Sequence, residues 1–290
     1  MTIGPRIETD YGGRQTIAAR RVLVDAGQVL ASFTDCLVVV GGWTPDLLLP
    51  NAENPHVGSI DVDLVLDAAK LNDGRYAELV KSLLDTKRYR LGEGVNTFQL
   101  VTDVDLKDGE KPVQVEVEFL APDNVRFKKH SRKLLENFRV LEVKSASEAL
   151  RNPVEIKLPG RNLRGAKNTV RLRVASLADF LVMKAHAIDG RDKPKDTYDF
   201  CYCLEQYSGG IEKLANDWKA RIKEPNIAEA VRILREKFSS VDSFGPQQLA
   251  EFHNSDNAEA QAMDARRAYE LVQKFLSHVE PAMPPPPAKN

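Results

Sequence analysis

Two acidic residues stand one residue apart in the stretch Gly58-Ser59-Ile60-Asp61-Val62-Asp63-Leu64. Apolar residues alternate with them, which predicts a strand whose side chains point in turn to opposite faces, so that Asp61 and Asp63 share one face. Two ionised carboxylates side by side repel each other, and a divalent cation between them removes that cost. Magnesium prefers carboxylate oxygens together with substrate phosphates, and two such ions can activate the attacking and leaving oxygens. The spacing therefore favours metal-assisted chemistry on a phosphate.

A second acidic pair follows in the run Val113–Phe119, where Glu116 and Glu118 alternate with valines. If this strand pairs beside the first, it presents a third carboxylate, either as a metal ligand or as a base for an acceptor hydroxyl. Alternating acid and valine is also the pattern of a half-exposed strand, which is the simpler interpretation of either pair taken alone.

A glycine pair, Gly41-Gly42, favours a phosphate site over a half-exposed strand as the interpretation of these acids. It follows the apolar run Cys36–Val40 and precedes a short predicted helix, Trp43–Leu49. Glycines at such a position let backbone amides approach a phosphate at the start of the helix. Any one of these features is common by chance. Their combination in this order is much rarer: a strand, two glycines, a short helix, a loop and then two spaced acids.

A third group of charged residues lies later in the chain. Lys184 falls on the apolar stripe of a predicted helix. A lysine that faces inward needs a phosphate or a carboxylate as its partner, unless its head reaches water. Pro194 suits the first turn of a following helix, on which Asp196 and Asp199 share a face. Acids at that place also occur simply because they complement the helix dipole.

The elements that must hold these residues form a mixed α/β sheet domain over residues 1–174, because strands alternate with helices. Asp108-Gly109 supplies turn chemistry between the last two predicted strands. The predicted helices are Arg14–Phe33, Trp43–Leu49 and Arg75–Lys87, and the predicted strands are Cys36–Val40, Ser59–Leu66, Asn96–Thr102 and Val113–Leu120.

The character of the chain changes after about residue 175. Ser176-Leu177-Ala178-Asp179 has the form of a capping box, and helical patterns such as Ile227–Phe238 and Ala258–Phe275 follow. We therefore expect a helical domain over residues 175–279 that completes the site. The proline-rich end, residues 280–290, is predicted to be disordered.

Composition limits the class of protein. Apolar residues make up 42% of the 290 residues and charged residues 29%, which is typical of a soluble globular chain. No apolar run is long enough to span a membrane, and the N-terminus lacks the apolar core of a signal peptide. The three cysteines are interpreted as buried thiols. We therefore expect a cytoplasmic protein with no membrane partner.

The net charge of −1 argues against binding nucleic acid over the whole surface, but it leaves room for a local basic patch. Two stretches carry lysines and arginines at a density that can follow a phosphate backbone. The first is Arg126–Lys133, for which a solvated face is the simpler interpretation. The second is a candidate RNA-binding surface or, equally, a solvated face, and its members are Arg161, Arg164, Lys167, Arg171 and Arg173.

Val40-Gly41-Gly42-Trp43, followed by Gly58–Leu64, resembles the signature of the polymerase-β-type nucleotidyltransferase superfamily. In that superfamily two acids of such a strand bind the metal, a third acid follows on a later strand, and the glycine element meets the triphosphate. The metal is expected to be magnesium, as one or two ions that manganese can replace. The resemblance implies that Asp61 and Asp63 are metal ligands, that Glu116 or Glu118 is the third acid, and that Gly41, Gly42 and Ser59 meet the triphosphate.

The later pattern Lys184-x-x-Ala187-x-x-x-Arg191-x-Lys193-x-Lys195-Asp196-x-Tyr198-Asp199 resembles a motif of AbiEii-type nucleotidyltransferases. These are toxins of type IV toxin–antitoxin and abortive-infection systems, and they include relatives that add nucleotides to transfer RNA. The resemblance covers roughly residues 37–202 and implies a cognate antitoxin. It also implies that Lys184 and Arg191 bind the triphosphate and that Asp196 or Asp199 completes the catalytic site. The chain departs from many such toxins at His56, where they carry an arginine.

Three functions remain open. The leading hypothesis is transfer of a nucleotide from a nucleoside triphosphate (NTP) to RNA, at the 3′ end of a transfer RNA, with release of pyrophosphate and a block of translation. A nucleotidyltransferase that modifies an aminoglycoside is the alternative, because Gly41-Gly42-Trp43 with a histidine before the acids also resembles those enzymes. The basic stretches favour RNA over a cationic drug. The third is a non-catalytic nucleotide- or RNA-binding relative, against which the intact Asp61 and Asp63 weigh.

Overall fold

The computed structural model describes residues 5–71, 73–92, 99–123 and 140–280. The chain divides into two compact units. The sheet unit comprises residues 9–50 and 55–183, and the helical unit comprises residues 1–8, 51–54 and 184–290. The division lies within helix α5, Leu177–Gly190, whereas the sequence places the change of character near residue 175.

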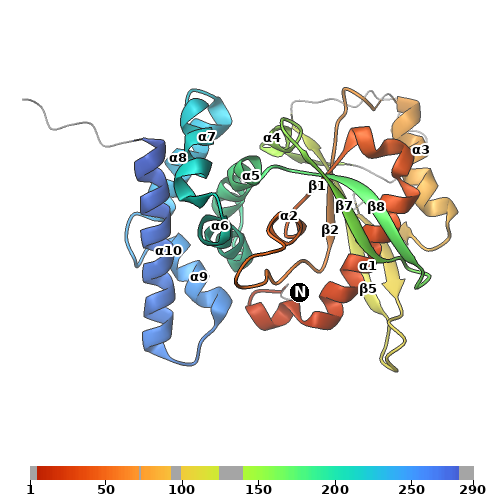
Figure 1. Ribbon diagram of the computed structural model, residues 1–290, viewed down its shortest axis with the longest axis horizontal. Helices are drawn as coiled ribbons and strands as arrows, with labels where there is room; N and C mark the ends of the chain where they lie inside the picture. The colour runs from red at the N-terminus through yellow and green to blue at the C-terminus, as the bar shows by residue number, and fades with distance from the viewer. Residues whose placement is uncertain (1–4, 72, 93–98, 124–139, 281–290) are drawn as a thin grey trace, which may run out of the picture. The chain divides into compact units, whose positions relative to one another are not determined.

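A mixed sheet runs through the sheet unit, as the sequence predicts (Figure 1). Within the described residues it has eight strands, in the order β3-β4-β5-β2-β1-β8-β7, and β6 pairs with β5 off this path. Strand β2 is antiparallel to β1 and parallel to β5, and β5 is antiparallel to β4. The bounds are β1 Leu37–Val40, β2 Val62–Leu66, β3 Arg90–Leu91, β4 Gln99–Val104, β5 Val113–Pro122, β6 Leu141–Val143, β7 Val154–Arg161 and β8 Lys167–Val174.

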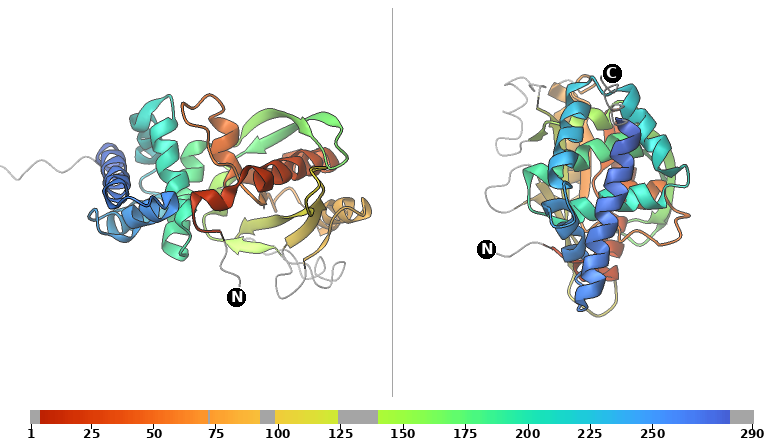
Figure 2. Two further views of the ribbon diagram at one scale, coloured as in Figure 1. Left: turned by 90° about the horizontal axis from the view of Figure 1, so that it is seen from below. Right: turned by 90° about the vertical axis from the view of Figure 1, so that its left-hand side faces the viewer.

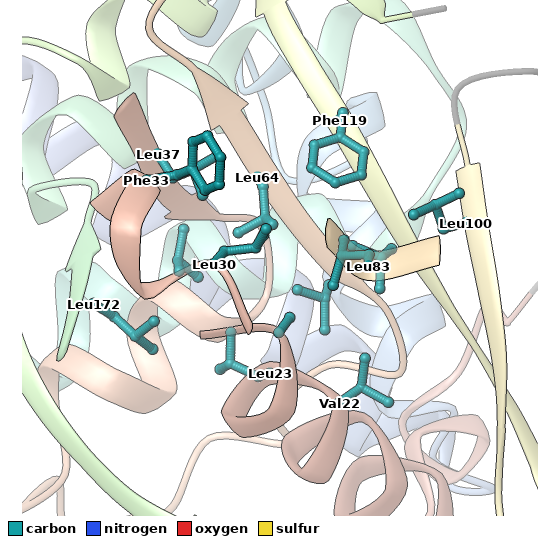
Figure 3. Close-up of a cluster of buried hydrophobic side chains, with 14 of the residues drawn as sticks. Val22, Leu23, Leu30, Phe33, Leu37, Leu64, Leu83, Leu100, Phe119 and Leu172 are labelled. Carbon is teal, nitrogen blue, oxygen red and sulfur yellow. The ribbon is translucent and has the colours of Figure 1, made fainter. Parts of the chain in front are cut away.

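One face of the sheet carries the hydrophobic core of this unit. Helix α1, Gly13–Val29, packs on the strands, and α3, Asp73–Asp85, contributes buried leucines to the same cluster. Figure 3 shows Leu64 and Phe119 of the sheet among these side chains. Because side chains alternate along a strand, the valines and the phenylalanine of β5 that enter the core leave Glu116 and Glu118 on the opposite face.

The predicted first helix, Arg14–Phe33, is wrong in its last turn. Helix α1 ends at Val29, and a 3-10 helix, η2 (Ala31–Cys36), continues the chain. The Thr34 hydroxyl donates to the Ala31 carbonyl over 2.9 Å, and a threonine side chain bonded to a nearby backbone carbonyl competes with α-helical bonding. The tighter turn buries Phe33.

The second predicted strand is also shorter than expected, because β2 begins at Val62 rather than Ser59. The predicted strand Asn96–Thr102 corresponds to β4 from Gln99 onward, and its first three residues lie outside the described part of the chain. The capping box is confirmed. The Asp179 amide donates to the Ser176 hydroxyl, which in turn donates to the Asp179 carboxylate over 2.6 Å.

The helical unit is built around its longest helix, α10, which is blue in Figure 2 and packs against α9, α7 and α6. Phe200, Trp218 and Phe275 meet edge to face in its core, with ring centroids 5.0–6.5 Å apart. The helices are α6 Pro194–Gln206, α7 Gly210–Ala220, α8 Pro225–Lys237, α9 Phe244–His253 and α10 Ala258–Val279.

Two further predictions can be compared with the structure, and a third falls largely outside the described residues. All three cysteines are buried and free, as expected. Within the described residues, no helix has the length and apolar character needed to cross a bilayer. Of the predicted disordered tail, residues 281–290 lie outside the described part of the chain.

Candidate active site

The acidic face of the sheet brings together side chains from three strands. Asp63 of β2 is the register partner of Glu118 on the parallel neighbour β5, so both side chains leave the sheet on one face. Gln99 of β4 lies opposite Glu118. Its amide donates to the Glu118 carboxylate and, over 3.1 Å, to Glu116. The sequence-predicted acids of β2 and β5 therefore do come together.

Gln99 was missed by sequence reasoning. The feature that could have predicted its role is the register of the β4–β5 hairpin, in which Gln99 lies opposite Glu118 and Val104 lies opposite Val113. A hairpin turn centred on Asp108-Gly109 fixes that register only once the loop length is known. The amide orients both glutamates, because each accepts a hydrogen bond from the same nitrogen.

Asp61 lies just before β2, in a bend rather than in the strand. Its backbone carbonyl accepts a hydrogen bond from the Trp43 indole over 2.7 Å, and its carboxylate accepts one from the Ser59 hydroxyl over 2.5 Å. The sequence prediction places Ser59 at the triphosphate, and the structure shows that its hydroxyl contacts Asp61. Gly58, which precedes this segment, donates its amide to the imidazole Nδ1 of His56 over 3.0 Å.

Gly41 connects the glycine turn to the acidic face. Its φ is +67°, and a Cβ built on it would lie 2.0 Å from Oδ2 of Asp63. Backbone and carboxylate therefore touch at this position, which only glycine allows. Gly42 follows as the N-cap of α2, Trp43–Leu48. The two parts of the predicted motif are in direct contact, although about twenty residues separate them in sequence.

The donor chemistry of this face fits a hard cation such as magnesium. Asp63 and Glu118 present carboxylate oxygens on this face, and Asp61 lies just before β2; carboxylate oxygens are the ligand type that magnesium prefers. Among the described residues, no three histidine, cysteine, aspartate or glutamate side chains converge as a complete metal cage. Magnesium is usually held by one or two carboxylates plus substrate phosphates and water, so a pair of acids is sufficient on the protein side.

A second charged cluster lies in the helical unit, and we call it the lysine–aspartate cluster: Lys184, Arg191, Lys195, Asp196 and Asp199. The Lys184 Nζ lies 2.6 Å from Asp196 and 2.6 Å from Asp199. Arg191 donates two hydrogen bonds to Asp196, and Lys195 donates to Asp199 over 2.6 Å. Of the partners that the sequence allows for an inward-facing Lys184, the structure shows carboxylates.

Burial and charge oppose each other in this cluster. Burial alone would lower the pKa of Lys184, but Asp196 and Asp199 outweigh it and hold that pKa above its usual value. Burial would likewise raise the pKa of Asp196, but Lys184 and Arg191 lower it to about 2. For Lys195 burial prevails over Asp199, and its pKa is lowered. Asp196 is therefore ionised at neutral pH.

The loop that carries Arg191 is tied down by the N-terminal segment. Arg6 donates to both carboxylate oxygens of Asp192, at 3.0 and 3.1 Å, and to Glu251 of α9 at 2.7 Å. Gln248 donates to Asp192 and to Glu251 as well. Sequence reasoning missed this network, because its members are up to 245 residues apart and carry no local pattern.

The second basic stretch lies on the β7–β8 hairpin, and the first, Arg126–Lys133, lies outside the described residues. Within the hairpin, Arg161 bonds the Gly165 carbonyl, and Arg173, which is partly buried, bonds the Asp35 carbonyl. The exposed members of the stretch are Arg161, Arg164, Lys167 and Arg171.

Asp63 of β2 and Glu118 of β5 thus lie side by side on one face of a mixed sheet, with the Gly41 turn against Asp63. A family model, the nucleotidyl transferase AbiEii toxin of type IV toxin–antitoxin systems, matches residues 28–289. The chain belongs to this family. The predicted family and fold class are confirmed.

Among solved structures, the chain is similar to the nucleotidyltransferase toxin MenT4 from Mycobacterium tuberculosis H37Rv. The two are 17% identical with a TM-score of 0.44, over 94% of this chain and 90% of that one. No curated protein matches the sequence.

Replacing Gly41 tests the glycine–carboxylate contact. Gly41→Ala adds a Cβ that strikes Asp63 and forces an L residue to a positive φ, so we expect the free energy of unfolding to fall by more than about 2 kcal/mol. Gly109→Ala is the control, because Gly109 has a φ of +86° with open space around it and should lose only about 1–2 kcal/mol. Equal losses in urea denaturation would show that Asp63 does not press on the turn.

Removing Lys184 tests the lysine–aspartate cluster. Lys184→Ala leaves two buried carboxylates short of their shared cation, so stability should fall by about 3–5 kcal/mol in urea denaturation. The exposed Lys219→Ala should stay within about 0.5 kcal/mol of the parent. A fully stable Lys184→Ala variant would contradict the buried pairing.

The lowered pKa of Asp196 makes the same cluster sensitive to acid. Its folded value of about 2 lies below the roughly 3.9 of an unfolded aspartate. The stabilisation is therefore present above about pH 4 and is lost as the pH falls through about 2. We expect Asp196→Asn to flatten the pH dependence of unfolding in this window. A variant with the same slope as the parent would overturn the assignment.

Proposed function

We propose that the protein is a metal-dependent nucleotidyltransferase that transfers a nucleotide from an NTP to RNA, at the 3′ end of a transfer RNA. Family membership establishes the class of nucleotidyltransferase toxin of a toxin–antitoxin system, and with it a cognate antitoxin. The NTP, the metal and the acceptor are our proposals. The observation that supports the metal and the NTP is the Asp63 carboxylate, which lies against Gly41 and beside Glu118 on one face of the sheet.

The acidic face would perform the transfer as follows. Asp61 and Asp63 would hold magnesium, whose positive charge stabilises the oxygens around the reacting phosphorus when it is bound. The acceptor hydroxyl oxygen forms a bond to the α-phosphorus while the bond from that phosphorus to pyrophosphate breaks. Pyrophosphate leaves with the bonding electrons, and the hydroxyl proton passes to Glu116 or Glu118, which Gln99 orients.

Within the lysine–aspartate cluster we assign different roles to the two predicted triphosphate ligands. The Lys184 side chain is only 9% exposed and is held by two carboxylates, whereas the Arg191 side chain is 55% exposed. Arg191 is also paired with Asp196, but its exposed guanidinium is the part of the cluster that phosphate oxygens in solvent can reach. Lys184 keeps Asp196 ionised and holds both Asp196 and Asp199 in place.

An RNA acceptor is favoured by the cations of the β7–β8 hairpin. Lys167 and Arg171 are exposed and have no carboxylate partner among the described residues. Cations in such a position attract a phosphate backbone and repel a positively charged aminoglycoside. The geometry therefore favours the RNA hypothesis over the small-molecule one.

Nucleotide transfer itself tests the proposal. The protein is incubated with each labelled NTP, magnesium and either total RNA, transfer RNA or an aminoglycoside, and labelled product and pyrophosphate are measured. We expect label in RNA, and loss of transfer in Asp63→Asn, because the variant lacks a metal-binding charge but creates no cavity. Asp103→Asn, which removes an exposed strand carboxylate paired with Arg90, should transfer like the parent.

Two outcomes would contradict the proposal. Near-normal transfer by a folded Asp63→Asn variant would place the metal site elsewhere. Label in the aminoglycoside with none in RNA would establish the small-molecule alternative.

A further inference from the structure

The β7–β8 hairpin has an outward face that is more basic than the linear sequence shows. In the antiparallel register, Lys157 lies opposite Arg171, and Arg161 lies opposite Lys167. All four are exposed, whereas Leu158 and Val170 are buried on the inward side. Lys157 lies outside the predicted basic stretch, and only the strand register places it in this group. Figures 1 and 2 show the hairpin as the green ribbon of β7 and β8.

The two cross-strand pairs are unfavourable by themselves. Like charges directly opposite each other destabilise a strand pair. Lys157, Lys167 and Arg171 form no ion pair with any described residue, and Arg161 bonds a backbone carbonyl. Two repulsive pairs on one exposed face therefore cost the hairpin stability in the free protein. A bound polyanion would turn that cost into attraction.

The residues between the two pairs limit which polyanion fits. Pro159 and Thr169 separate them, and Glu155 opposite Arg173 follows at the far end. Four residues of strand put the two pairs about 13 Å apart. This face carries no aromatic side chain. Proteins that bind single-stranded nucleic acid combine cations with aromatic rings on which bases stack. Double-helical RNA is bound mainly through its phosphates, 2′-hydroxyls and shape.

We propose that the outward face of the β7–β8 hairpin binds a double-helical arm of the acceptor RNA through its phosphates, without reading base sequence. The inference rests on the proposed function in that the acceptor is RNA. It adds that a double-helical part of the acceptor is held by this face and that Lys157 belongs to the surface that holds it. Contacts through phosphates release counterions, so binding is expected to weaken steeply with salt.

The test measures binding without NTP or metal, by fluorescence anisotropy at several salt concentrations. The probes are an RNA stem-loop and an unstructured RNA of the same composition. The variant is Lys157→Glu with Lys167→Glu, which reverses one lysine in each pair. The control is Lys219→Glu with Lys274→Glu, which makes the same charge change at exposed lysines of α7 and α10.

We expect the parent to bind the stem-loop about tenfold or more tightly than the unstructured RNA. The hairpin variant should lose about tenfold in stem-loop affinity, and its slope of log affinity against log salt should be shallower by about 2. The control should bind like the parent. The melting temperature of the hairpin variant should stay level or rise, because each substitution places a carboxylate opposite an arginine.

Equal affinity for the two RNAs, unchanged binding by the hairpin variant, or an equal loss in the control would each overturn the inference. A lower melting temperature of the hairpin variant would also overturn it, since the lysines would then be structural. Failure of the proposed function is separate and is read in the transfer assay. If the protein transfers a nucleotide to RNA but binds the stem-loop no more tightly than the unstructured RNA, only this inference is overturned.

Discussion

The close contact between Gly41 and the Asp63 carboxylate is the constraint on which the acidic face depends. Val40, the last residue of β1, pairs with Asp63 of β2, so the chain must turn immediately beside the carboxylate. The turn needs a positive φ and leaves no room for a Cβ. Glycine meets both requirements at one position, and the result is a backbone turn in contact with the Asp63 carboxylate.

Much of the acidic face could be predicted because strand alternation is a local property. Once Val62 and Val117 face the core, Asp63 and Glu118 must face away from it, and their register in the parallel pair makes them neighbours. The bend at Asp61 was not predictable from that pattern. It depends on the Trp43 indole, which bonds the Asp61 carbonyl from eighteen residues away and gives it a partner outside the strand ladder.

In the lysine–aspartate cluster, helical periodicity predicts which side chains are buried but not which partners they contact. The helical pattern correctly places Lys184 on a buried stripe, but it cannot say what the ammonium meets there. That depends on how the chain between α5 and α6 folds back, which brings Asp196 and Asp199 to Lys184. The turn is held by Arg6 through Asp192, a contact with no counterpart in local sequence. Side-chain direction is therefore encoded locally, and the identity of the partner is not.

Although the net charge of the chain is −1, strands of the sheet unit carry two surfaces whose charges have opposite sign. Both surfaces follow from strand alternation. Where apolar side chains fill the inner face, the residues between them project from the outer face. In β2 and β5 those outer residues include Asp63, Glu116 and Glu118, which suit a metal ion and the phosphates that it binds. In β7 and β8 they are mostly cations, which suit a polymer of phosphates. The outward face of the hairpin offers Glu155 against five cations, Lys157, Arg161, Lys167, Arg171 and Arg173. The outward charge of the hairpin is thus specified by the same pattern that folds it.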